Sequence, residues 1–431
     1  MGFGLAALTR LAGSSVIDKA GLRGPVQNLV KASTRNGFRA AGAATRSFRS
    51  AQRLGKPARL APAGDTGLFD VTPTEEQQLI AETVAEFAAE QLRPAAADAD
   101  AKLAAPEGLL TRAAELGISL VGIPEELGGA GTERSVVTNA LVAEALAHGD
   151  LGLAVAVIAP SAVSTALVAW GDEQQQADYV PAFTGEQVPA AALALVERSP
   201  LADPFKPATT AKRTPKGYQL DGVKSLVPRA AQAELFIVSA DLEGRGPALF
   251  LVESSSAGMT VEAEPAMGLR GSATGTVHLE KVALPAGALL GGGRAEVFTE
   301  VVRLSRLGWA ALAAGTAKAV LDYVVPYVNE RTAFGEPISH RQAVAFSVAD
   351  IAIELEGLRL VMLRAAARAE QGKAYAREVA LARKLAVDKG MQIGNAGVQL
   401  LGGHGFVKEH PVERWYRDLR AVGVMEGAVL L

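Results

Sequence analysis

Leu235-Phe-Ile-Val-Ser239 and Ala248-Leu-Phe-Leu-Val252 flank the turn sequence Glu243-Gly-Arg-Gly246 and give the clearest indication of the fold class. Short apolar runs that a glycine-containing turn separates are typical of paired antiparallel strands. Two more runs of this kind are Gly217-Tyr-Gln-Leu220 and Thr274-Gly-Thr-Val-His-Leu279. The pattern predicts an antiparallel β domain in the middle of the chain.

On either side of this domain the pattern is helical. Thr74-Glu-Glu-Gln77 resembles a capping box at the start of a helical run that we expect Pro94 to end. Long Ala/Leu-rich patterns of a length that suits an antiparallel four-helix bundle cover about Val301–Glu330, Arg341–Gln371 and Arg377–Val398. We therefore predict an α+β fold with an N-terminal helical domain at 67–190, a middle β domain at 191–295 and a C-terminal four-helix bundle at 296–431.

The composition excludes several classes of site. The chain has 431 residues, a length sufficient for two or three domains with a large core. Hydrophobic residues make up 49% of it and charged residues 21%. It has no cysteine, which excludes disulfides, thiolate catalysis and Cys-ligated metal centres. Its five histidines are scattered and form no His-x-x-x-His pair, so we predict no metal site.

Charge divides the chain near residue 60. Residues 1–60 contain eleven Lys/Arg and one acid, Asp18, a balance of +10, so the rest carries about −13 by subtraction from the total of −3. An acidic body argues against nucleic acid as the main partner. We expect residues 1–66 to form a basic N-terminal extension and linker.

The extension has a helical pattern with two distinct faces. Five arginines would share one face and four apolar residues another, namely Arg35, Arg39, Arg46, Arg49 and Arg53, and Phe38, Ala41, Ala44 and Phe48. Such a helix can lie on an anionic membrane or an acidic partner. A disordered basic tail and a removable transit peptide are the alternatives. The matching locations are the cytoplasm, with peripheral membrane contact through residues 1–60, or the mitochondrial matrix.

Residues Leu151–Trp170 contain no charged residue and are about as long as a membrane-spanning helix. Pro160 falls at the centre of the stretch, where proline breaks or kinks a helix. We therefore expect two short buried helical pieces and predict no transmembrane segment.

One carboxylate, Glu426, stands in the otherwise uncharged stretch Ala421–Leu431. It follows a glycine-rich segment, Gln399–Phe406, and the charged cluster Arg417-Asp-Leu-Arg420. A carboxylate flanked by apolar residues is poorly hydrated, which favours its use as a general base near neutral pH. The alternative interpretation of this local pattern is a glutamate that faces solvent.

Several motifs, in this order along the chain, resemble the acyl-CoA dehydrogenase family over about residues 70–431. They are Leu116–Gly131, Met267–Ser272 with His278–Pro285 and Leu290-Gly291, Arg331–Gly335 with Gln342, Gln399–Phe406 with Arg417-Asp418, and Glu426-Gly427. The resemblance implies formation of an α,β double bond in an acyl-CoA thioester, as in fatty acid metabolism. Glu426 would remove the α-proton while the β-hydrogen leaves as hydride to N5 of FAD.

The resemblance also implies binding residues. Those implied for FAD are Arg331, Phe334, Gln342, Gln399, Gly402, Gly403, Val196 and Pro228. The first three would serve the cofactor of a neighbouring subunit, which implies a homodimer, a homotetramer or a hetero-oligomer. Arg306 is implied for substrate binding. Ser305 occupies the position where some subgroups carry the base, and serine cannot do that job.

Two segments depart from the family pattern where it contacts the flavin ring. Val196–Asp203 lacks most of the usual hydroxyls and glycines. In Lys224–Ala230, Leu226 replaces a tryptophan and Pro228 replaces a threonine, and proline has no N–H to donate.

These matches and departures together leave two candidate functions. The first is an active dehydrogenase that passes electrons to an electron-transfer flavoprotein. The second is a flavin-poor partner subunit or scaffold of a hetero-oligomeric acyl-CoA dehydrogenase complex, including one at a membrane.

Overall fold

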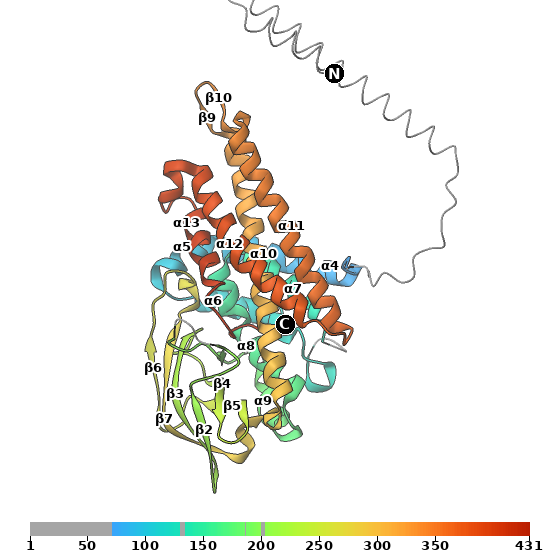
Figure 1. Ribbon diagram of the computed structural model, residues 1–431, viewed down its shortest axis with the longest axis vertical. Coiled ribbons are helices and arrows are strands. Elements are labelled where there is room, and N and C mark those ends of the chain that lie inside the picture. The colour runs from blue at the N-terminus through green and yellow to red at the C-terminus, as the bar shows by residue number, and fades with distance from the viewer. Residues whose placement is uncertain (1–70, 130–133, 186, 200–202) are drawn as a thin grey trace, which may run out of the picture. The chain divides into compact units, whose positions relative to one another are not determined.

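The computed structural model describes residues 71–129, 134–185, 187–199 and 203–431. In these residues the elements follow the predicted order of helices, β sheet and helices, which confirms the predicted fold class (Figure 1). The predicted arginine face of residues 35–53 lies outside the described residues.

The N-terminal helices begin at the predicted capping box. The Thr74 hydroxyl accepts the N–H of Gln77, and the Gln77 side chain accepts the N–H of Thr74, which confirms the box. The helices are α4 Glu75–Phe87, α5 Arg93–Lys102, α6 Glu107–Glu115, α7 Val136–Gly149, α8 Leu151–Trp170 and α9 Glu173–Phe183.

The prediction that Pro94 ends the first helical run is wrong. The chain passes from α4 through a π turn at Ala88–Leu92 directly into α5, with Pro94 in the first turn of α5. A proline lacks an N–H, and its ring crowds the carbonyl four residues before it. The wider π turn immediately before Pro94 accommodates the proline ring, so the helical hydrogen-bond pattern changes locally but the helix continues.

The prediction of two short helical pieces around Pro160 is also wrong, because α8 is one helix of 20 residues. Every residue from Leu151 to Leu167 except Ser161 is buried, so packing on all sides holds both halves of the helix in line. By length and composition α8 is long and apolar enough to cross a membrane, yet 83% of its most apolar 18-residue segment is buried inside the protein. Burial of this extent is typical of a core helix of a folded domain.

The middle domain is one sheet in which antiparallel pairs predominate. Its strands run in the order β6-β7-β3-β2-β4-β5-β8, with β1 also on β4. The bounds are β1 Ala191–Ala194, β2 Thr210–Thr214, β3 Gly217–Val227, β4 Leu235–Leu242, β5 Gly246–Glu253, β6 Met259–Ala263, β7 Gly275–Pro285 and β8 Leu289–Leu290.

Residues 235–252 form the predicted hairpin of β4 and β5, and two further strands pair with β4 in parallel. In β4 and β5, Leu235 lies opposite Glu253 and Leu242 opposite Gly246. The sequence pattern did not predict that β1 and β2 pair with the other edge of β4 in parallel. Residues Ala191–Ala194 form an all-buried run of alanine and leucine, which is common in parallel strands but carries no alternating signal.

The C-terminal helices are α10 Ala295–Glu330, α11 Gln342–Glu370, α12 Ala376–Leu401 and α13 Val412–Ala421. The three long ones agree with the predicted helices within a few residues at most ends. Figure 1 shows α10 running from the level of the sheet to the hairpin of β9 Thr332–Ala333 and β10 Glu336–Pro337, which stands at the far end of the bundle. One helix thus connects two distant ends of the protein.

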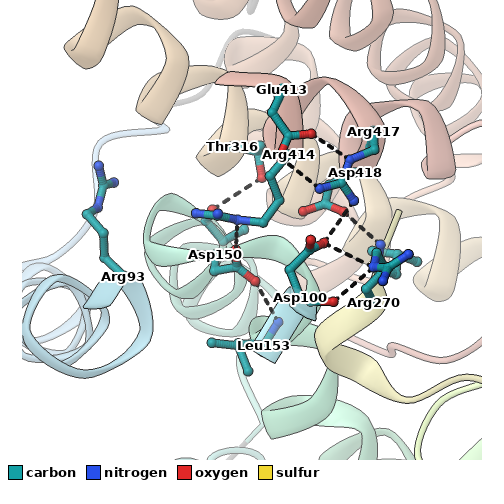
Figure 2. Close-up of polar contacts among 12 residues, drawn as sticks. Arg93, Asp100, Asp150, Leu153, Arg270, Thr316, Glu413, Arg414, Arg417 and Asp418 are labelled. Atoms are coloured by element: carbon teal, nitrogen blue, oxygen red, sulfur yellow. Dashed lines mark hydrogen bonds and ion pairs between the residues drawn. The ribbon is translucent and has the colours of Figure 1, made fainter. Parts of the chain in front are cut away.

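A buried ionic cluster joins the three regions (Figure 2). Arg417 of α13 donates to the Asp100 carboxylate of α5 at 2.8 Å, and Arg270 from the sheet region donates to the Asp100 carbonyl at 2.9 Å. Arg414 of α13 donates to Asp150, the N-cap of α8, at 2.9 Å. Removal of one partner from such a buried pair leaves an uncompensated charge and is strongly destabilising.

Asp418 of the same helix is fully buried beside this cluster. Burial, and then the negative charge of Asp150, raise the pKa of Asp418 to about 7, against the opposing effects of the Leu269 N–H, which donates to it at 2.7 Å, and of the nearby arginines. The folded protein therefore holds a proton that the unfolded chain releases above its ordinary pKa of 3.8. The contribution of this proton to stability is complete below about pH 4 and is lost as the pH rises through about 7.

We expect Asp418→Asn to remove this part of the pH dependence. The amide oxygen still accepts the Leu269 N–H, but the side chain no longer titrates. The stability of the variant relative to the natural protein should therefore improve as the pH rises from 4 to 8, as measured by urea denaturation across that range. Asp98→Asn, at an exposed carboxylate of α5, is the control. Parallel stability curves for Asp418→Asn and the natural protein would contradict this account.

Candidate functional site

A single carbonyl group, that of Gly427, fixes the segment around Glu426. It accepts the Ser305 hydroxyl at 2.9 Å and the Trp309 indole N–H at 2.8 Å, both from α10. On the other side, the N–H of Ala428 donates to the carbonyl of Leu193 in β1 at 3.1 Å. The segment is therefore held between a helix of the bundle and a strand of the sheet.

Glu426 lies at this junction with two arginines around its carboxylate. Arg306 donates through Nε to both carboxylate oxygens at 3.0 Å and through Nη2 at 2.8 Å. Arg383 of α12 donates at 3.5 Å to the same carboxylate and at 2.7 Å to the carbonyl of Met425. The expectation of apolar surroundings is wrong, and so is the alternative of a solvent-facing glutamate, because only 15% of the Glu426 side chain is exposed.

Ser305 has a positioning role that its sequence position did not predict. Serine at this position cannot act as a base, but its hydroxyl holds the backbone directly beside Glu426. Trp309 follows one helical turn later on the same face of α10, and it is fully buried. The helix thus presents two donors, four residues apart, to one carbonyl.

Arg306, predicted for substrate binding, is held by its charge partner and by an aromatic ring. Its guanidinium lies 5.2 Å from the centre of the Phe205 ring, which is a cation–π distance. Arg383, which the sequence did not single out, contributes a second positive charge. Burial lowers the pKa of Arg383, although the negative charge of Glu426 acts to raise it. The Nη1 atom of Arg383 has no hydrogen-bond partner among the described residues. Arg383 therefore keeps one buried donor near Glu426 that no described residue uses.

The segments that depart from the family pattern lie beside this junction. The carbonyl of Val196, which follows β1, accepts the N–H of Ser225 at 3.0 Å. The N–H of Leu226 donates to Glu264 at 2.7 Å, and that of Arg229 donates to the Ser272 carbonyl at 2.9 Å. These three N–H groups around Pro228, which has none, are satisfied within the protein.

Glu264 anchors this loop. Burial alone would raise its pKa, but hydrogen bonds from the Leu226 N–H, the Ser225 hydroxyl and the Thr276 hydroxyl together lower the pKa of Glu264. Leu226 has a left-handed φ of 53° and borders an apolar cavity of about 110 Å³ next to Met267 and Met425. Pockets for small-molecule ligands usually exceed about 300 Å³, so this cavity is small for a ring system.

The remaining predicted cofactor residues gather at the far end of α10. Arg331 caps the end of α10, Phe334 lies between β9 and β10, and Gln342 begins α11. The Phe334 ring is 96% exposed. Nearby, the Tyr327 hydroxyl donates to the carbonyl of Leu401, at the end of α12. The end of α10 that leads into the hairpin thus contacts the end of α12.

The glycines after α12 leave the surface beside them open. Gly402 has φ 56° and ψ −127°, a conformation that side-chain-bearing residues rarely adopt. A Cβ atom added at Gly402 or Gly403 would meet no atom within 4 Å, and the carbonyl of Gln399 accepts the N–H of Gly402. The backbone is therefore accessible to a ligand from outside the chain.

The predicted site residues thus form two groups, at opposite ends of α10. From Arg306 to Glu330 the helix rises about 36 Å at 1.5 Å per residue. Glu426, Arg306, Val196 and Pro228 lie at the sheet end, whereas the hairpin residues and the glycines lie at the other. No single FAD molecule can bridge the two ends within one chain.

Three family models match the chain in order. They describe the acyl-CoA dehydrogenase N-terminal domain at residues 74–187, the middle domain at 192–282 and the C-terminal domain at 293–429. The short-chain specific acyl-CoA dehydrogenase of Bos taurus is 32% identical over 362 residues, which cover 82% of this chain and 87% of that protein.

Solved structures give the same result. Butyryl-CoA dehydrogenase from Megasphaera elsdenii is 28% identical, with a TM-score of 0.76, and the match covers 83% of this chain and 95% of that one. A chain from a structure titled as an electron transferring flavoprotein of Acidaminococcus fermentans is 30% identical, with the same TM-score and coverage.

We expect Trp309→Phe to destabilise the protein by about 1 kcal/mol more than Trp415→Phe does. Both changes remove a similar ring volume from a fully buried site. The Trp309 indole loses a hydrogen bond to Gly427, whereas the Trp415 indole N–H has no partner among the described residues. Urea denaturation of the two variants measures the difference. An equal loss, or a larger one for Trp415→Phe, would show that the Gly427 bond contributes little.

Proposed function

Because the chain belongs to the acyl-CoA dehydrogenase family, a family of FAD-dependent oxidoreductases, we propose that it catalyses α,β-dehydrogenation of an acyl-CoA thioester with Glu426 as the base. The observation that carries the proposal is the geometry around Glu426. Gly427 is fixed by Ser305, Trp309 and β1, so the carboxylate beside it has a defined position between the bundle and the sheet. A general base must have such a position to reach the α-proton.

Arg306 would exchange partners during the reaction. In this structure three hydrogen bonds from Arg306 occupy both oxygens of Glu426. For Glu426 to accept the α-proton, one oxygen must be released towards the substrate. The guanidinium would then donate to the acyl-CoA, which agrees with the predicted role of Arg306 in substrate binding, and Arg383 would keep a positive charge beside the carboxylate.

The predicted FAD-binding residues suit the cofactor better at the hairpin end of α10 than at the sheet end. FAD, when bound, supplies the acceptor for the hydride that leaves the β-carbon. At the hairpin end, exposed Arg331, Phe334 and Gln342 and the open glycines Gly402 and Gly403 suit the adenosine and pyrophosphate of a neighbour's cofactor. At the sheet end, Val196 and Pro228 would border the ring.

A second candidate function follows from that ring end. Pro228 has no N–H, and the neighbouring N–H groups of Ser225, Leu226 and Arg229 are used within the chain. A chain that holds little flavin itself would act as a partner subunit of a hetero-oligomeric dehydrogenase. The absorption spectrum of the purified protein separates the two functions, because a flavin band at one FAD per chain favours the first and its absence the second.

An electron-transfer flavoprotein as electron acceptor belongs to the first function. The similar chain from the Acidaminococcus fermentans structure, whose title names such a protein, supports this choice. We also propose a cytoplasmic protein whose residues 1–60 contact an anionic membrane surface, which their charge of +10 supports. A mitochondrial matrix location would follow if these residues act as a transit peptide.

We expect Glu426→Gln to lower the turnover of acyl-CoA by a factor of about 10²–10⁴, because it removes a positioned base while it keeps the side-chain shape. Turnover with an artificial electron acceptor measures the effect. Glu413→Gln is a matched control, because Glu413 also binds an arginine, Arg417, through two hydrogen bonds but lies outside the site. Near-natural turnover in Glu426→Gln would exclude Glu426 as the base.

We expect Arg331→Ala to lower the FAD content of the assembled protein far more than its helix content. Arg331 is exposed and ends α10, so its loss leaves the bundle intact while it removes a cation from the neighbour's cofactor site. Flavin absorbance per chain and circular dichroism measure the two quantities. Arg377→Ala, an exposed arginine at the other end of the bundle, is the control. A monomer in light scattering, or unchanged flavin content, would contradict the shared site.

A further inference from the structure

The segment that follows Gly427 runs into the interior of the protein. Ala428, Val429, Leu430 and Leu431 are all buried, with exposed fractions between 0 and 6%. Four residues extend the chain by at most about 14 Å, so Leu430 lies within that distance of the Glu426 backbone. The candidate base and a buried apolar segment thus occupy the same region.

Three helices form the walls of the cleft that this segment fills. On α10, a Cβ atom added at Gly308 would come within 2.9 Å of Val429 and 3.5 Å of Leu431, so glycine makes room for the segment. On the opposite side, Leu430 and Leu431 meet α7, α8 and the loop before them. The residues there are Ile118, Val121, Asn139, Val142, Ala143, Ile158, Ser161 and Thr165.

The two leucines leave little space in this cleft. A gap of about 30 Å³ remains between them and the helices, which is far below the volume of a ligand pocket. Without the leucine side chains, this gap would widen between α7, α8 and α10, a few residues along the chain from Glu426. An alkyl chain whose α-carbon meets Glu426 needs apolar space of this kind.

Polar side chains are also among the residues that line the cleft. The Asn139 Oδ1 and Ser161 Oγ atoms are buried and have no hydrogen-bond partner among the described residues. Buried polar atoms without partners are rare, and an alkyl chain that reached them would leave them unsatisfied. The leucine side chains therefore block a long acyl chain, and an alkyl chain in their place would bring no hydrogen-bond partner to these polar atoms.

We propose that Leu430 and Leu431 form the floor of the acyl cavity and restrict the substrate to short acyl chains. The inference rests on the proposed function, because it places the acyl group next to Glu426. It assigns chain-length selection to a segment of the chain that directly follows the base, so that the backbone bonds of Gly427 position the base and the floor together.

The test compares acyl-CoA substrates of four, six and eight carbons. We expect Leu430→Ala and Leu431→Ala to raise the ratio of kcat/KM for octanoyl-CoA over butyryl-CoA by at least about tenfold each, since one methylene in a pocket is worth that much. Leu430→Met, which conserves volume, should keep the natural ratio. Leu242→Ala, a fully buried leucine of the sheet core, is the control for general loosening.

A binding measurement provides a readout besides turnover. Alkyl-CoA thioethers of the same lengths lack the carbonyl and cannot react, and calorimetry should show tighter binding of the longer ones to the alanine variants only. An unchanged preference in both alanine variants, or the same change in Leu242→Ala, overturns the proposal. If the natural protein binds these thioethers but turns over no acyl-CoA, the proposed function fails, and the thioether preference alone then decides the inference. A natural protein that binds none of them overturns both.

Discussion

The Gly427 peptide joins the C-terminal helical bundle to the β sheet. A carbonyl oxygen has two lone pairs, and here both are engaged by donors from one face of α10. The N–H of the same peptide, that of Ala428, donates to Leu193 of β1, so the C-terminal segment lies beside a strand whose Ala194 comes 233 residues before Gly427. The positions of Glu426 on one side and of the buried leucines on the other both follow from this one anchored peptide. Arg414 with Asp150 and Arg417 with Asp100 hold α13, which leads into the segment, against the N-terminal helices.

The sequence predicted the elements whose signal is local. The hairpin of β4 and β5 has two apolar runs and a glycine turn, and α10, α11 and α12 are long enough for their periodicity to average out local exceptions. The two errors about proline share one cause. Pro94 and Pro160 do weaken a helix on their own, but a π turn absorbs the first and burial on all sides supports the second. Tertiary packing decided both, and no window of sequence contains that information. The parallel pairing of β1 with β4 was missed for the same reason, since four buried residues show no alternation.

The candidate site divides in the same way. Glu426 was singled out as the candidate base because it is a single carboxylate in an uncharged stretch and because of the order of motifs before it. Its partners could not be found, because Arg383 sits in a helix with several other basic residues and Trp309 in a long apolar run, and nothing nearby in sequence marks either one. The sequence also misjudged the surroundings of Glu426, since its apolar neighbours along the chain are not its neighbours in space. The departures at Leu226 and Pro228 were visible in the sequence, whereas the way Glu264 ties up the loop required the structure.

The length of α10 links cofactor retention to the amount of protein present. If the residues for the two ends of one FAD come from different chains, a dissociated chain offers only half of the contacts. Dilution then weakens cofactor binding without any change in a residue, because subunit association and cofactor binding become one linked equilibrium. A cell that makes little of the chain would hold mostly empty protein, and a modest rise in expression would increase the loaded fraction more than in proportion. Abundance itself would then regulate the activity.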